Sequence, residues 1–117
     1  MPIPDLESML LPMLKFLADK KDHNMNDVEN SLSVIFGLTE MEKKQPKPSG
    51  GETLFHNRLH WAKFYLKKAQ LISSKPRGPF RITELGLKTL KGNPRKIDTL
   101  YLMQFHEFAN FIKLKRK

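Results

Sequence analysis

The sequence predicts a mainly α-helical fold with one small β-hairpin, arranged as a winged helix-turn-helix. Two observations lead to this fold class. Apolar residues recur at three- and four-residue spacing between positions 55 and 69, which indicates a helix with one buried face. Directly after it, two short β-compatible runs at 71–74 and 80–82 flank the segment KPRGP. Proline and glycine favour tight reversals, so these runs are expected to pair as a hairpin.

The start of the chain is expected to form a helix that belongs mainly to the core. Met1–Pro4 is an extended lead because it contains two prolines, and Asp5 can cap the helix that follows. Apolar residues form one stripe over 6–17, which Pro12 interrupts. We therefore expect a kink or a restart at Pro12 and an end of the helix within 19–22.

Two capping signals predict the next elements. Asn24 with Asp27 resembles a capping box, and so does Thr39 with Glu42, which opens a short helical turn. Between them, Gly37 is expected to end the second helix in a left-handed conformation. The buried face of that helix is expected to consist of Val28, Leu32, Ile35 and Phe36. The segment KQPKPSGG that follows is a loop by composition.

After the hairpin, Thr83 precedes a helix over 84–91, whose Leu85, Leu87 and Leu90 are expected to cover the core. The chain breaks at 92–94, and Asp98 can cap one more helix. We divide the chain into a winged-helix domain, 1–92, and a helical extension leading towards a linker, 93–117. The extension has one apolar face, which must be covered. We expect it to pack on the first helix, at Met9, Met13 and Phe16, with dimerisation as the alternative; the face consists of Phe105, Phe108, Ala109 and Ile112.

Charge is distributed unevenly along the 117 residues, which form a single domain by length. The formal net charge is +9 and the isoelectric point is near 9.9. Residues 1–45 hold five Lys/Arg against eight Asp/Glu, whereas residues 46–117 hold sixteen against four. This asymmetry indicates a polyanionic partner for one face of the molecule.

Composition excludes several classes of function. There is no cysteine, so disulfides and thiolate metal sites are excluded. No apolar run approaches the roughly 18 residues of a membrane span, and no signal peptide is evident, so we expect a cytoplasmic protein without membrane contact. Phosphate-binding loops, nucleophile motifs and nuclease-like acidic clusters are also missing. We therefore expect no catalytic residues, cofactor or metal in this chain.

The basic helix and the hairpin together predict a DNA-binding surface. On the helix, basic and hydrogen-bonding residues lie opposite the apolar face in a stripe about three turns long, which fits a major groove. Asn57 and Arg58 lie near the helix start, where recognition helices usually meet base edges. A basic hairpin can lie along the neighbouring phosphates. The candidate DNA-binding residues are His56, Asn57, Arg58, His60, Lys63, Phe64, Lys67, Lys68, Lys75, Arg77 and Arg81.

Two other interpretations of the helix are less well supported. His56 and His60 are four residues apart, as in a zinc-protease helix, but position 57 is Asn where the catalytic Glu would stand, and no third ligand is evident. Trp61 and Tyr65 could stack on a base or sugar. Aromatic residues on a helix that also faces a core more often pack, so we expect Trp61 to be half-buried.

With these residues in view, the chain resembles the N-terminal winged-helix domain of Mrr-type restriction endonucleases. The resemblance runs almost end to end, through MPIPD, LLPMLKFLAD, FGLTE, PSG, FHNRLHWAKFYLKKAQLI, RGPFRITELG and IDTLYLMQFHEF. It implies that this domain binds double-stranded DNA and that a separate nuclease domain cuts modified, chiefly methylated, DNA. The sequence stops before such a domain, so the resemblance implies a targeting module.

The chain departs from this family at Gln70, where such domains often have Gly. A side chain there costs about 1 kcal/mol if the position requires a left-handed backbone.

Two functions of other classes remain open at this point. The chain could be a stand-alone winged-helix transcription regulator whose C-terminal helix makes a homodimer. It could also be a winged-helix protein-interaction module whose basic face is incidental.

Overall fold

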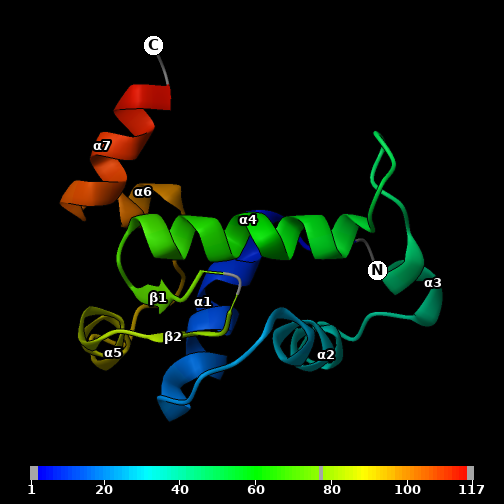
Figure 1. Ribbon diagram of the computed structural model, residues 1–117, viewed down its shortest axis with the longest axis horizontal. Helices are drawn as coiled ribbons and strands as arrows, with labels where there is room; N and C mark the ends of the chain where they lie inside the picture. Colours follow the sequence, from blue (N-terminus) through cyan, green and yellow to red (C-terminus); the bar gives the residue numbers. More distant parts are fainter. Residues whose placement is uncertain (1–2, 77, 116–117) are drawn as a thin grey trace.

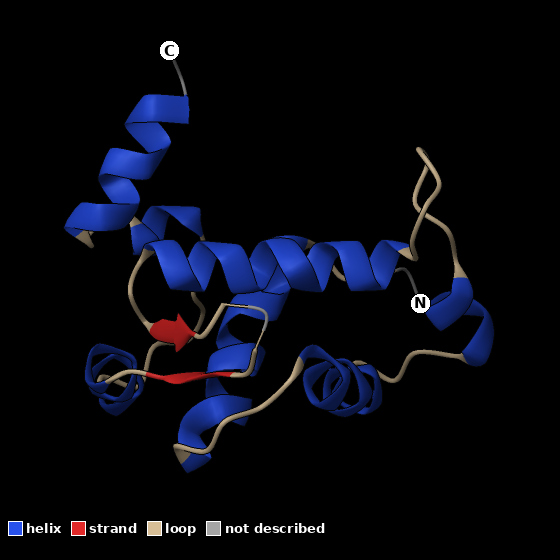
Figure 2. Cartoon of the chain, in the orientation of Figure 1, coloured by secondary structure: helices blue, strands red, loops and turns tan. Residues whose placement is uncertain are grey.

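The computed structural model describes residues 3–76 and 78–115, which form a mainly helical fold with one two-stranded hairpin (Figures 1 and 2). The hairpin follows the longest helix directly, as in the predicted winged-helix arrangement. In chain order the elements are α1 (Leu6–Phe16), the 3-10 helix η1 (Leu17–Asp19), α2 (Met25–Ile35), α3 (Glu40–Lys44), α4 (Leu54–Lys68), β1 (Ile72–Ser74), β2 (Phe80–Ile82), α5 (Glu84–Lys91), α6 (Thr99–Leu102) and α7 (His106–Lys115).

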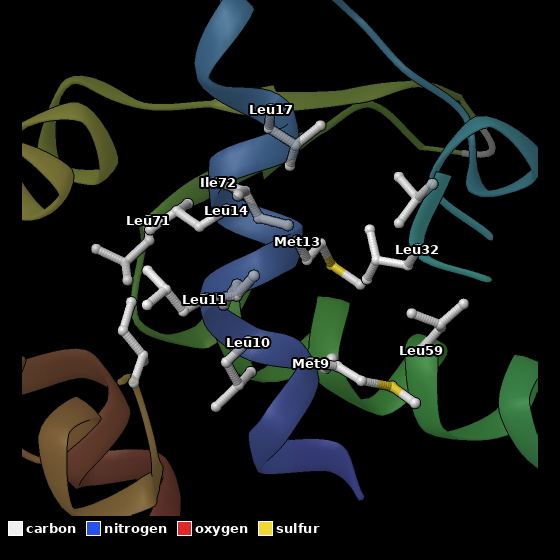
Figure 3. Close-up of a cluster of buried hydrophobic side chains, with 14 of the residues drawn as sticks. Met9, Leu10, Leu11, Met13, Leu14, Leu17, Leu32, Leu59, Leu71 and Ile72 are labelled. Carbon is white, nitrogen blue, oxygen red and sulfur yellow. The ribbon is translucent and has the colours of Figure 1, made fainter. Parts of the chain in front are cut away.

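Helix α1 is the centre of the core, and the other elements pack around it (Figure 3). Its side chains Met9, Leu10, Met13 and Leu14 are fully buried among residues of α2, α4 and β1. A kink or a restart was predicted at Pro12. The restart does not occur: α1 runs without interruption from Leu6 to Phe16. Proline removes one backbone donor, and the burial on both sides of it holds the helix together.

The predicted caps are present. Asn24 accepts a hydrogen bond from the backbone N–H of Asp27, and Thr39 accepts one from Glu42, each within a complete capping box. The buried face of α2 differs from the prediction at one position. Ile35 is 61% exposed, because the buried side of the helix is centred on Val28, Leu32 and the partly buried Phe36.

Two helices end in the same left-handed turn. After α2, Gly37 has a φ of 64°, and the N–H groups of residues 37 and 38 donate to the carbonyls of residues 34 and 33. After α4, Gln70 has the same φ of 64°, and the N–H groups of residues 70 and 71 donate to the carbonyls of residues 67 and 66. These are Schellman motifs, which glycine normally completes. Gln70 therefore has the left-handed backbone at which a side chain was predicted to cost about 1 kcal/mol.

The hairpin is short and is held in place by its neighbours. Ile72 pairs with Ile82 and Ser74 with Phe80, and β2 gains a further antiparallel bridge to His23. Helix α5 approaches the hairpin so closely that a methyl group on Gly86 would overlap the Leu71 carbonyl and Ile82. Of the three leucines predicted to cover the core, Leu87 and Leu90 do so. Leu85 is 37% exposed, because it lies outside the face of α5 that contains Gly86 and Thr89.

The C-terminal segment forms two helices where one was predicted. Asp98 caps α6 as expected, but the chain turns at 103–105 before α7 begins. Figure 1 shows α7 beside the C-terminal end of α4. Phe108 is fully buried, and its ring lies 5.4 Å from that of Tyr65 on α4. The predicted packing on Met9 and Met13 of α1 is therefore wrong, because other elements already bury both methionines.

Within residues 3–76 and 78–115, every helix is too short or too polar to span a bilayer.

Truncating Phe108 tests whether α7 is part of the monomer core. We expect Phe108→Ala to lower the free energy of unfolding by about 3–5 kcal/mol, because it leaves a cavity between α4 and α7. Urea denaturation measures this change, and sedimentation should give the same mass for variant and wild type. A wild-type dimer that Phe108→Ala converts into a stable monomer would contradict this packing.

Replacing Gln70 with Gly should stabilise the protein by about 1 kcal/mol, because glycine adopts a positive φ without the clash of a Cβ atom. The measurement is the midpoint of urea unfolding. Gln104→Gly is the matched control, since Gln104 is not among the positive-φ residues and should gain nothing. Equal effects at the two positions would show that the backbone at Gln70 is not strained.

Candidate nucleic-acid interface

Helix α4 has one buried face and one face directed away from the core. Thr53 caps the helix through the N–H of His56, and the buried side matches the predicted apolar stripe in full. Because α-helical residues advance about 100° each, the residues between the apolar positions point outwards. We call this side the outer face of α4; it comprises His56, Asn57, His60, Trp61, Lys63, Phe64, Lys67 and Lys68.

The first turn of the outer face is tied to neighbouring elements by two carboxylates. His56 Nδ1 lies 2.9 Å from Glu29 Oε2 of α2. Asn57 Nδ2 donates to Glu52 Oε1 at 2.6 Å, and this bond is the largest cause of the lowered pKa of Glu52. The carboxamide of Asn57 is therefore held in one orientation, and Glu52 remains ionised at neutral pH.

His60 lies in the middle of the outer face. Its ring is in edge-to-face contact with that of His56, at 4.7 Å between centroids. Desolvation of the part that packs against its neighbours lowers the pKa of His60, and the nearby His56 and Lys63 lower it further. His60 is therefore a neutral hydrogen-bonding group at pH 7 in the free protein.

The C-terminal half of the outer face consists of cations without acidic partners. Among the described residues, Lys63, Lys67 and Lys68 have no carboxylate within salt-bridge distance. Lys63 Nζ lies 4.7 Å above the ring of Phe80, and burial followed by repulsion from Lys67 lowers its pKa. Lys68 Nζ lies over two aromatic rings, those of Phe64 on α4 and Phe111 on α7. The positive potential of these three lysines is therefore not neutralised by any carboxylate among the described residues.

The predicted DNA-binding residues of the hairpin, Lys75 and Arg81, are paired with a carboxylate, unlike the lysines of α4. Arg81 Nε donates to Asp22 Oδ1 at 2.7 Å, and Lys75 Nζ lies 3.7 Å from the other oxygen of the same carboxylate. The bond from Arg81 is the largest cause of the lowered pKa of Asp22. The hairpin therefore holds two cations that share one anion. Arg77 lies outside the described residues.

Arg58 lies beside the outer face rather than on it. Its guanidinium Nη1 donates to the backbone carbonyls of Ile3 and Pro4 at 2.8 and 3.0 Å. These bonds fasten the extended start of the chain to α4. Arg58 thus stands apart from the other sequence-predicted residues of α4.

Three depressions follow the outer face, and Phe64 lines all of them. One of about 370 Å³ is lined by Glu52, Asn57, His60, Trp61 and Phe64. A smaller depression of about 130 Å³ is lined by His60, Lys63, Phe64 and Lys67. A third, of about 360 Å³, lies between the end of α4 and α7. Trp61 is 43% exposed, close to the predicted half-burial, and its ring meets that of Phe64 edge-on at 5.6 Å.

The spacing of His56 and His60 resembles a zinc-binding helix, but a metal site was not predicted there. In the ranges that the structure describes, no group of three or more His, Cys, Asp or Glu side chains is placed to hold a metal ion. Sequence reasoning did not identify Glu29, Glu52 or Asp22 as neighbours of the basic residues. Only Glu52 had a local signal, since it immediately precedes the cap of α4 and lies five residues before Asn57.

Comparisons with known proteins agree with the resemblance seen in the sequence. The family model of the Mrr N-terminal domain matches residues 7–92. The type IV methyl-directed restriction enzyme EcoKMrr of Escherichia coli K12 is 28% identical over 96 residues, which is 81% of this chain. The match covers 31% of that enzyme, so the chain spans about a third of its relative. No solved structure matches. Since the family model covers most of the chain, the protein belongs to the family of N-terminal domains of Mrr-type restriction enzymes.

Proposed function

We propose that this domain binds double-stranded DNA through the outer face of α4 and so directs a restriction nuclease to its target. One observation carries the proposal: Lys63, Lys67 and Lys68 lie along an outward helix face without acidic partners among the described residues. A row of unneutralised cations at helical spacing suits the phosphates that border a major groove.

The similarity to EcoKMrr suggests which DNA is bound and which activity the binding serves. Its name describes a methyl-directed restriction enzyme, and we extend modified DNA as the target to this chain. The segments of the relative outside the match would then contain the nuclease, and this chain would contribute binding without catalysis. Such a system acts on DNA in the cytoplasm.

The contacts that each residue makes in the free protein suggest whether it binds phosphates or base edges. Lys63, Lys67 and Lys68 are assigned to phosphates, because phosphate contacts need charge and not orientation. Asn57 and His60 present oriented hydrogen-bonding groups and are assigned to base edges. Two further predicted residues of α4 support this surface from behind, because His56 is bound to Glu29 of α2 and Arg58 to the start of the chain.

The alternative regulator requires a homodimer formed by the C-terminal helix. Phe108, the centre of the face that would dimerise, is fully buried against Tyr65 within one chain. This burial favours a monomeric targeting domain over a dimeric regulator.

Removing one lysine from the outer face tests the proposed interface. Lys67→Ala should weaken binding to a duplex of any sequence and reduce the salt slope of the affinity by about 1, because one phosphate contact is lost. Lys63→Ala should act similarly, with some loss of packing on Phe80. Lys96→Ala is the control, since it removes the same charge from the segment before α6. Fluorescence anisotropy over a salt series measures each slope, and equal slopes for Lys67→Ala and the control would exclude α4 from the interface.

Neutralising Asp22 tests the wing. Asp22→Asn frees Lys75 and Arg81 from their shared carboxylate, so DNA should bind more tightly and with a steeper salt dependence. Glu40→Gln is the matched control, because it removes an equal charge from a surface carboxylate that pairs with Lys43. An increase of the same size in both variants would reduce the effect to net charge and remove the hairpin from the interface.

A further inference from the structure

We propose that the groove between the C-terminal end of α4 and α7 binds a backbone phosphate of the DNA duplex, and that the carboxamide of Gln70 donates to it. This inference rests on the proposed DNA binding by the outer face of α4 and extends that interface onto α7. The groove has a volume of about 360 Å³. We call it the α4–α7 groove; its polar lining consists of Lys67, Lys68, Gln70, Glu107 and Asn110.

Gln70 occupies its position at an energetic cost. Its φ is 64°, a left-handed conformation that glycine adopts without the clash of a Cβ atom. Its side chain is exposed and lines the groove, so burial in the core does not offset this cost. Among the described residues, Lys20 and Asn93 also have a positive φ, but Gln70 is the one that directly follows the outer face of α4. Strained residues often serve binding sites, and we therefore assign this side chain to a ligand.

The α4 side of the groove is cationic. Among the described residues, Lys67 and Lys68 have no carboxylate within salt-bridge distance. Lys68 Nζ lies 5.3 Å from the ring centroid of Phe64 and 5.5 Å from that of Phe111, which places the ammonium group at the seam between the two helices. A phosphate in the groove therefore meets two charges that no carboxylate neutralises.

Two features of the groove oppose an anion, and one of them is reduced by the fold. The last carbonyls of a helix carry partial negative charge when they are unpaired. After α4, the N–H groups of residues 70 and 71 donate to the carbonyls of residues 67 and 66, which satisfies these two acceptors. The second feature is Glu107, the acidic residue of the lining. Its charge repels a phosphate, so its removal is expected to strengthen binding.

Helix α7 lies where the backbone of a bound duplex would pass. It stands beside the C-terminal end of α4 (Figure 1), and phosphates border the groove that a recognition helix occupies. Asn110 Nδ2 lies 3.1 Å from His106 Nε2 and has a second hydrogen available for a phosphate oxygen. Leu114 is 71% exposed and lines the same groove, where it suits the carbon atoms of a sugar.

Packing of α7 on α4 is the competing explanation of the groove, because Phe108 and Phe111 already join the two helices through Tyr65. Gln70 is then only a strained turn residue, and Gln70→Gly gains stability without any change in DNA binding. If the groove binds a phosphate, the same variant gains stability and loses affinity. A loss of affinity in a more stable protein cannot result from unfolding.

The test measures the affinity of the full chain for one unmodified duplex over a salt series. Gln70→Gly should bind about fivefold more weakly, the equivalent of one hydrogen bond, and keep the wild-type salt slope because no charge is lost. Gln104→Gly is the matched control, since Gln104 is exposed but does not line the groove. Glu107→Gln should bind more tightly than the wild type, and by a larger factor than Glu40→Gln, which removes an equal charge from α3.

NMR gives a readout that does not depend on the affinity. Addition of the duplex should shift the side-chain amide signals of Gln70 and Asn110 and leave that of Gln104 in place.

The inference is overturned if Gln70→Gly binds DNA as the wild type does, or if Glu107→Gln and Glu40→Gln change the affinity equally. In both cases a reduced salt slope in Lys63→Ala leaves the proposed DNA binding by α4 intact. Absence of binding to any duplex at low salt overturns the proposed function itself.

Discussion

Burial of one face of α4 against α1 is the interaction on which the fold and the candidate interface both depend. Phe55, Leu59 and Leu66 of α4 are fully buried in the cluster that surrounds α1. Each large side chain removed from water contributes roughly 1.5–3 kcal/mol, so the rotation of α4 about its axis is strongly fixed. Residues on the far side of the same helix must then face outwards. The apolar spacing thus determines the direction of Lys67 and Phe64, although neither belongs to the fully buried core.

Features that depend on neighbours within a few residues were accessible from the sequence. The capping boxes at Asn24 and Thr39, the hairpin and the left-handed turn after α2 follow from local hydrogen bonding and backbone sterics. The turn at Gln70 shows how this local rule yields to packing. Its successor Leu71 is fully buried next to the hairpin, and Gly86 of α5 lies against the Leu71 carbonyl. The chain must turn there, so the non-glycine residue adopts the left-handed conformation.

Pairings between distant segments could not be predicted, because no periodic pattern encodes them. Asp22 is 59 residues from Arg81, and Glu29 is 27 residues from His56. Each changes the interpretation of a residue that looks like a free cation or hydrogen-bonding group in the sequence. The position of α7 has the same origin. An apolar stripe requires a partner, but which surface it meets depends on the completed core. Met9 and Met13 of α1 are fully buried, and Phe108 packs on Tyr65 of α4.

The outer face of α4 has an order along its length that follows from these distant contacts. Towards the C-terminal end, three lysines without carboxylate partners among the described residues suit phosphates, which are alike at every base pair. Towards the N-terminal end, Glu52 fixes Asn57, and an anion enters a face that is otherwise basic. Phe64 lies at the boundary, between Trp61 on one side and Phe111 of α7 on the other. In the proposed complex, the lysines supply affinity for any duplex, and Asn57, held by Glu52, presents an oriented carboxamide to a base edge. Affinity and selectivity then come from different turns of α4, so the charge of the chain indicates the first and not the second.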